Sequence, residues 1–403
     1  AASDGCTSRF GRRRPVILAG LASTWVAGLL FASAEDLLPR DRAAGFAAAM
    51  YWVVAVAVNV LQIPHRALVA DLASERQQVP LQAVFVLFMA IGNLLGYAIT
   101  QIYDAAAEHM FALMVGVCSL NTVCIAVQLL IVAEQPLQRE VGALRESVCA
   151  PVCGIVRVAK GSPRLLYHLA AVQCLVWIGS TAWNIYGEQW FTTSVFVGDQ
   201  SAPDGSQAKM DYNEGMIAFG HGGQASSMLQ LISSLGMITI LLKRLLRPRL
   251  VYAPCIFVGG LASVLAALVV GHSGGFAMLC MTLSVMPETG SFAIPFALVA
   301  AWNKRAEDEG REASTALQMA LLNCCVIAGR QICTMIVAAI EGGMSLQAAL
   351  PCIFIMAATM QVLAGGGALC LDDAPPAKDA GDCGPGLGRA TQVLAGSGAL
   401  FFD

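Results

Sequence analysis

The stretch FAAAMYWVVAVAVNVLQIPHRALVAD, residues 46–71, joins a long apolar run to a proline, a histidine, an arginine and an aspartate. Residues 46–65 are long enough to cross a bilayer as a helix, and Pro64 removes one backbone donor from it. Arg66 ends the run, where an unpaired guanidinium costs free energy. We therefore expect Arg66 to have a functional role, and Asn59 and Gln62 to face a cavity as candidate substrate contacts. The alternative is that Arg66 extends to the lipid headgroups and Pro64 only kinks the helix.

The rest of the chain is also apolar. The whole chain is 57 % hydrophobic and 13 % charged, with a mean hydropathy of +0.66, whereas about a quarter of the residues of a soluble protein are charged. This composition predicts an all-α, multi-pass membrane protein embedded in a lipid bilayer. The net charge of -3 gives no general attraction to nucleic acid. Apolar runs of spanning length cover residues 15–33, 46–65, 81–102, 111–132, 165–186, 224–242, 251–270, 276–301, 315–340 and 346–370.

The basic residues give the chain an orientation and a division. Most of the 24 Lys and Arg residues fall in alternate loops, which places both termini in the cytosol and the polar stretch 187–223 outside. GRRRPVILAGLAS, ending at Ser23, is echoed by LLRPRLVYAPCIFVGGLAS, ending at Ser263. We therefore predict helical bundles at 1–133 and 165–370, a central cytosolic loop at 134–164 and a disordered tail at 371–403. Four runs precede the loop and six follow it, so we expect the first two helices of twelve to be missing.

Two charged residues interrupt the second half. Glu288 lies in MPETGSFAIPF, with Pro287 and Pro295 on either side of it, and Arg330 lies in CCVIAGRQICTM. Both positions fall at a similar depth in their predicted helices, so each charge would lower the cost of burying the other. We expect them either to form a structural tie or to couple transport to a proton.

Aromatic and amide side chains mark a candidate sugar site. Trp177, Trp183 and Asn184 lie at the end of one predicted helix, followed by Glu188. Indole rings can stack on the apolar faces of sugars while amides and carboxylates bond to hydroxyls. The alternative, an aromatic belt at the membrane interface, applies to Tyr186 and Trp190, which follow on the same stretch, whereas Trp177 and Trp183 lie deeper.

Other motifs are weaker. The charges of Asp4, Arg9, Arg12 and Arg13 predict a latch that holds one gate state, or else simply orient the chain. GNLLG, residues 92–96, predicts a close helix contact. GHSGG, residues 271–275, matches the G-x-S-x-G nucleophile turn but has no predicted strand before it, so we predict no enzyme. The 14 cysteines contain no CxxC, and we predict no metal site and no cofactor.

Several of these strings together resemble the sucrose-transporter branch of the glycoside-pentoside-cation symporters, in the major facilitator superfamily. They are SDGCTSRFGRRRPVILAG, LQIPHRALVADL, GNLLGY, WIGSTAW and SFAIPFALVAAW. The resemblance implies a twelve-helix parent with two bundles, proton-coupled uptake of sucrose or related glucosides, a substrate-binding role for Arg66, and a plasma or vacuolar membrane.

The chain departs from that family at two acidic positions. Ala55 stands eleven positions before Arg66, where the family usually carries an acidic residue. The family's acidic run after the seventh helix is replaced by residues 187–194, in which Glu188 partly compensates. Glu288 therefore becomes the candidate proton carrier. The alternative function is a non-transporting membrane sensor, or an inactive truncated transporter homologue.

Overall fold

The computed structural model describes residues 8, 10–11, 13–72, 77–102, 109–132, 164–243, 245–268, 273–308 and 315–371. These residues form helices and connections, with no strand among them. The elements are α1 (Arg14–Ala32), α2 (Ala34–Leu37), α3 (Arg40–Leu72), α4 (Gln78–Ile102), α5 (Met110–Ile131), α7 (Arg164–Gln189), the π-helix η2 (Trp190–Val195), α8 (Gln207–Leu242), α9 (Pro248–Leu268), α10 (Gly274–Ser284), α11 (Met286–Asp308), α12 (Thr315–Glu341) and α13 (Leu346–Leu369).

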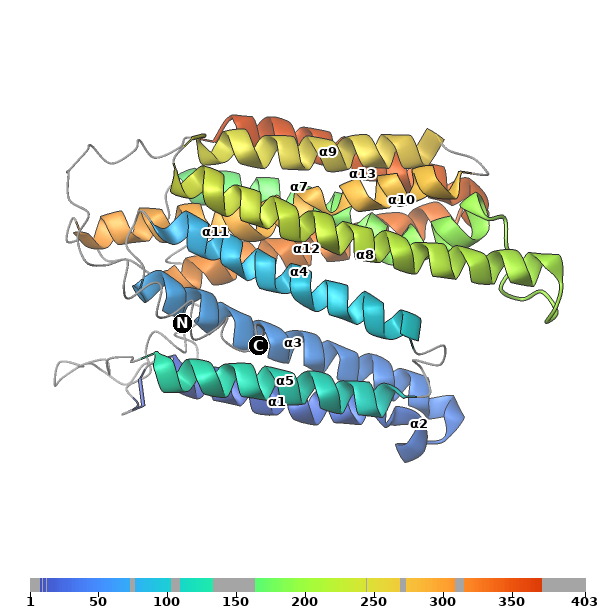
Figure 1. Cartoon of the computed structure of the whole chain (residues 1–403), viewed down its shortest axis with the longest axis horizontal. Helices are drawn as coiled ribbons and strands as arrows, with labels where there is room; N and C mark the ends of the chain where they lie inside the picture. Colours follow the sequence, from blue (N-terminus) through green and yellow to red (C-terminus); the bar gives the residue numbers. More distant parts are fainter. Residues whose placement is uncertain are drawn as a thin grey trace.

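Within the described ranges, ten helical stretches are long and apolar enough to cross a membrane, as predicted. A helix pairs its backbone polar groups internally, whereas lipid tails offer them no hydrogen-bond partner. Successive membrane-spanning stretches run in opposite directions, with α10 and α11 together forming one stretch, so the bundle has two ends (Figure 1). We call the end where α1, α4, α7, α9 and α12 begin the basic end, because it carries residues such as Arg14, Arg164 and Lys243. The opposite end, where α8, α10 and α13 begin, is the η2 end.

The predicted start of α8 is wrong. The apolar run begins at residue 224, but α8 begins at Gln207 and includes residues 207–223 of the polar stretch 187–223. The side chain of Ser206 caps the helix by accepting from the Lys209 amide at 3.3 Å. One turn on, Gln207 Nε2 donates to Asp211 Oδ1 at 2.6 Å. Local polar bonds therefore extend this helix beyond its apolar run.

The predicted interruption before Glu288 is present. Helix α10 ends at Ser284 and α11 begins at Met286, with Pro287 in its first turn. A Cβ on Gly259 of α9 would lie 2.1 Å from Pro287 Cγ, so only glycine lets α9 approach the break this closely. Further along α11, Pro295 has no amide hydrogen to donate to the Ser291 carbonyl, which instead accepts from Gln173 Nε2 at 3.0 Å.

The helices pack in two groups. The first contains α1, α3 and α5, and the second contains α4 and α7 to α13. Helix α1 packs along α3 and α5, whereas α4 makes its largest contact with α8 and also packs on α11 (Figure 1). The dense core lies in the second group. In the α10–α11 stretch, 72 % of the most apolar window is buried, against 11 % in α3 and in α5. The predicted central loop and tail lie outside the described residues, except for Arg164 and Leu371.

Candidate functional site

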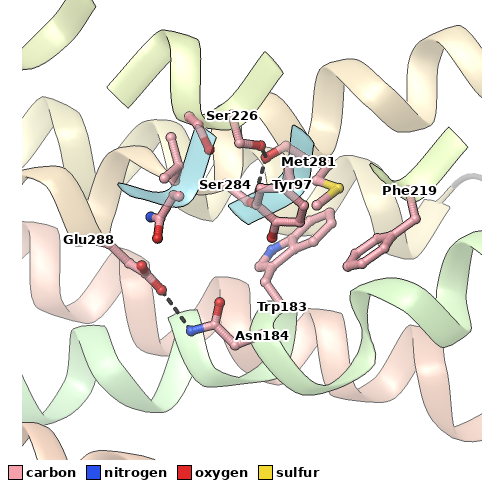
Figure 2. Close-up of a pocket in the computed structure, with 11 residues that line it drawn as sticks. Tyr97, Trp183, Asn184, Phe219, Ser226, Met281, Ser284 and Glu288 are labelled. Atoms are coloured by element: carbon pink, nitrogen blue, oxygen red, sulfur yellow. Dashed lines mark hydrogen bonds between the residues drawn. The ribbon is translucent and has the colours of Figure 1, made fainter. Parts of the chain in front are cut away.

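A cavity of about 110 Å³ opens where α4 meets α7, α8 and the α10–α11 break (Figure 2). Helices α4, α7, α8, α10 and α11 supply its walls. They contribute Asn93 and Tyr97; Trp183 and Asn184; Phe219, Ser226 and Ser227; and Met281, Ser284, Val285 and Glu288.

The polar wall is centred on Glu288. Asn184 Nδ2 donates to Glu288 Oε1 at 2.8 Å, and Figure 2 shows the two side chains facing each other from α7 and α11. The helix break places Glu288 in the first turn of α11. Unpaired amide hydrogens at a helix N-terminus favour negative charge nearby. The sequence interruption therefore supplies a carboxylate site inside the membrane span.

The aromatic wall is held rigidly on one side. Trp183 Nε1 donates to Ser263 Oγ at 2.9 Å, and its ring lies 4.7 Å from that of Phe354, between centroids. Across the cavity, the Tyr97 ring meets Phe219 edge-on at 6.4 Å. A Cβ on Gly223 would lie 2.4 Å from Tyr97 Cε1. The position of Tyr97 therefore depends on glycine at 223.

Serine hydroxyls form the third wall. Ser226 Oγ donates to the Met281 carbonyl at 2.8 Å, joining α8 to α10, and Ser284 Oγ donates to the same carbonyl at 2.7 Å. These hydroxyl protons are occupied, but each oxygen can still accept a hydrogen bond. The cavity thus combines a carboxylate, amides, hydroxyl acceptors and aromatic rings.

Arg66 lies outside the cavity lining. Its Nη1 donates to Gln82 Oε1 at 3.0 Å and to the Phe292 carbonyl at 2.9 Å. Its guanidinium carbon is 4.3 Å from the centroid of the Phe296 ring, and the residue is only 9 % exposed. Arg66 therefore ties α3 to α4 and α11 in this conformation.

Three more of the predicted substrate contacts also lie apart from the cavity. Asn59 accepts a very short hydrogen bond from Asn323 Nδ2 of α12, and Gln62 is exposed. Trp177 is fully buried, with its ring centroid 4.9 Å from that of Phe292. Of the six predicted substrate residues, the cavity brings together Trp183 and Asn184.

Among the predicted coupling residues, Glu288 is the one that lines this cavity. The Arg330 guanidinium carbon lies 4.5 Å from the centroid of the Trp177 ring, and its charge attracts Glu288 through space. Glu188 lines a second cavity at the η2 end. Asp4, Arg9 and Arg12 of the predicted latch lie outside the described residues, and Arg13 is buried.

The structure also tests the motifs GNLLG and GHSGG. Nothing lies within 4 Å of a Cβ built on Gly92 or Gly96, so the predicted close contact at GNLLG is wrong. The Asn93 amide between them does bond across helices, donating to Gln230 Oε1 at 3.2 Å. Ser273 of GHSGG caps α10, accepting from the Phe276 amide at 3.3 Å.

Sequence reasoning missed the contributions of α4, α8 and α10 to the cavity. Tyr97, Phe219 and Met281 read as ordinary apolar helix residues. A signal was present in GGQASS, residues 222–227, where glycines and serines recur one turn apart on one face of α8. Small residues at this spacing allow a neighbouring helix to approach closely.

The arrangement matches known transporters. Residues 1–184 match the family model described as MFS/sugar transport protein. The E. coli fucose:proton symporter FucP superposes with a TM-score of 0.58 at 14 % identity, covering 90 % of this chain and 85 % of the symporter. The chain has the major facilitator fold.

The chain is also similar in sequence to curated sucrose transport proteins. Sucrose transport protein SUT5 of Oryza sativa subsp. indica is 25 % identical over 277 residues, which is 61 % of this chain and 50 % of SUT5. Sucrose transport protein SUC4 of Arabidopsis thaliana is 24 % identical over 348 residues, which is 74 % of this chain and 65 % of SUC4. The chain thus spans 50 % and 65 % of the lengths of these relatives. The predicted resemblance to the sucrose-transporter branch of the major facilitators is confirmed.

Proposed function

We propose that the protein is a secondary active transporter of sucrose or a related glycoside, driven by protons. The observation that carries this proposal is the bonded Asn184 and Glu288 pair, which faces aromatic rings in a membrane-embedded cavity of a major facilitator fold. Rings to stack on a sugar and polar groups to bond its hydroxyls are what a glycoside site requires. The relatives' names, as sucrose transport proteins, agree with this substrate class.

Glu288 is the proposed proton carrier. An ionised carboxylate accepts hydrogen bonds only, so one N–H of Asn184 Nδ2 donates to Glu288 while the acid is charged. When Glu288 takes up a proton, it no longer requires that bond, and the Asn184 amide becomes available to a sugar hydroxyl. Proton and sugar would therefore bind together, and the neutral, loaded site would change conformation without carrying an unpaired charge.

The proposed cycle requires the two predicted bundles, residues 1–133 and 165–370, to rock. The cavity of about 110 Å³ is smaller than the roughly 300–1,000 Å³ typical of small-molecule sites, so a disaccharide needs the walls to separate. The Arg66 bond to the Phe292 carbonyl spans the two halves and would break when the basic end opens. Arg66, Asn59, Gln62 and Trp177 are then candidates for sugar contact in that second state.

The orientation and division of the chain belong to the same proposal. The concentration of basic residues at the basic end supports a cytosolic orientation for that end. The family resemblance supports a plasma or vacuolar membrane. Residues 1–133 and 165–370 would form the two rocking bundles, with Arg13 in a cytosolic latch.

Uptake of labelled sucrose by proteoliposomes tests this function. With the lumen alkaline, we expect sucrose to accumulate above its external concentration and to leave again when a protonophore removes the gradient. Sucrose that only equilibrates, at the same level with and without the gradient, would contradict proton-driven transport.

A further inference from the structure

A second cavity, of about 490 Å³, lies at the η2 end of the bundle. Its volume falls within the roughly 300–1,000 Å³ typical of small-molecule sites. Its lining includes Glu188 and Thr192 from α7 and η2, Asp199 and Gln200 from the following connection, Tyr212 from α8 and Gln347 from α13. We call it the outer cavity.

The two cavities follow one another along the same pair of helices. On α7, Asn184 lines the central cavity and Glu188 lines the outer one, four residues later. On α8, Phe219 lines the central cavity and Tyr212 lines the outer one, seven residues earlier. Four and seven residues are about one and two helical turns, so each helix turns one face to both cavities. A ligand in the outer cavity lies about one to two turns from the central cavity.

The wall of the outer cavity has an unusual backbone that close packing imposes. It includes the π-helix η2, an uncommon element that often occurs at functional sites. Val197 has φ 57°, a left-handed conformation that a β-branched residue adopts only when its surroundings impose it. The next residue supplies the constraint. The Gly198 amide donates to the Thr192 carbonyl at 2.8 Å, and a Cβ on Gly198 would lie 2.3 Å from the Tyr212 nitrogen.

The chemistry of the lining suits hydroxyl groups. The Ser201 hydroxyl and amide donate to Asp199 Oδ1 at 2.7 and 2.8 Å, and these bonds lower the pKa of Asp199, so the acid stays an acceptor at neutral pH. Gln200 and Gln347 can both donate and accept, and Tyr212 offers a ring.

A cation is a poorer fit than a neutral ligand. Lys209 Nζ lies 5.6 Å from the centroid of the Tyr212 ring and donates to the Gln200 carbonyl at 2.8 Å. Its positive charge repels a second cation beside the ring and partly balances the two carboxylates. Neutral hydroxyls can bond to the carboxylates, amides and threonine hydroxyls of the lining.

We propose that the outer cavity is a weaker binding site for a glycoside, which collects the sugar before it reaches the central cavity. This inference rests on the proposed function, because the outer cavity would bind the same class of ligand as the central cavity.

Equilibrium binding of labelled sucrose to the purified protein tests the inference. We expect two saturable components. Tyr212→Ala removes the stacking ring, and Gln347→Trp fills the outer cavity, so each should abolish the weaker component. Tyr212→Phe keeps the ring and should retain it. Gln207→Ala, at a neighbouring position outside the lining, should leave both components unchanged.

The outcomes separate the two proposals. If Asn184→Ala removes the tighter component and leaves the weaker one, the outer cavity binds sugar by itself. A single component that is lost in Asn184→Ala, and unchanged by Tyr212→Ala and Gln347→Trp, would overturn the outer site while the central site stands. A single component with the reverse sensitivity would overturn the central site instead. Complete absence of sucrose binding would contradict both.

Discussion

Glu288 owes its place inside the membrane span to two local features. It lies in the first turn of α11, where amide hydrogens favour a negative charge, and it accepts a hydrogen bond from Asn184. Its neighbours in the cavity are rings and hydroxyls that are already oriented by other bonds. A small set of side chains therefore holds the charge and the proposed sugar contacts in one place.

Gly223 is expected to control substrate affinity through Tyr97. In Gly223→Ala the new Cβ would lie 2.4 Å from Tyr97 Cε1, so the ring must move. We expect KM for sucrose to rise by about tenfold, which corresponds to roughly 1.4 kcal/mol of lost binding. Transport kinetics at a fixed proton gradient measure this.

The matched control lies on the same helix. A Cβ on Gly236 has no atom within 4 Å, so Gly236→Ala should leave KM unchanged. Equal KM values for the wild type and both variants would show that the Tyr97 position does not matter for sugar binding.

Single residues also show what sequence can predict. The prolines around Glu288 predicted the helix interruption that the structure shows, and Trp183 and Asn184, predicted from their chemistry, line the same cavity as Glu288. The partners of Arg66 were not predictable, because the Phe292 carbonyl comes from a helix 226 positions away and meets Arg66 only after packing. An arginine at the end of an apolar run shows that a partner is needed, but not which one.

At the level of elements, the break between α10 and α11 determines the site. The break turns one long apolar stretch into two helices and gives α11 an N-terminus beside the cavity. Helix α9 supports it through the close approach of Gly259 to Pro287. The position of Glu288 therefore depends on a contact with a third helix.

Gly259→Ala is expected to destabilise this break. Its Cβ would lie 2.1 Å from Pro287 Cγ, and overpacking of this kind costs about 1–3 kcal/mol. We expect a lower midpoint of thermal unfolding in detergent and reduced sucrose uptake. In the neighbouring Gly260→Ala, the nearest atom is 3.5 Å away, an ordinary contact, so that variant should resemble the wild type.

A double variant distinguishes the clash from other effects. Pro287→Ala removes the atom that a side chain at 259 would meet, so Gly259→Ala should cost less in that background. An equal loss of thermal stability in both backgrounds would mean that the α9 contact with Pro287 does not support the break.

Elements differ in how far their sequence specifies them. Apolar length and prolines predicted the spans and the break, because both act within one segment. The start of α8 was wrong because it is set by a serine cap and a side-chain bond rather than by hydropathy. The GNLLG prediction was wrong because the spacing permits a close contact without supplying a partner helix.

At the scale of the whole molecule, α4 connects the two groups of helices. It follows α3 in the chain, yet it packs on α8 and α11 and brings Tyr97 to the residues of the second half. The fold and the ten spans were predictable from apolar runs and from the family resemblance. Which helices meet around the cavity was not, because that depends on packing across the whole chain.

Glu288 is proposed to couple sugar movement to a proton. The most direct test compares accumulation with exchange of labelled sucrose in proteoliposomes containing wild type, Glu288→Gln or Glu214→Gln, the last being an exposed carboxylate on α8. A glutamine mimics a neutral, permanently loaded carboxyl. We predict that Glu288→Gln retains exchange but no longer accumulates sucrose against its gradient, while Glu214→Gln behaves like the wild type. Accumulation by Glu288→Gln at the wild-type level would contradict the account.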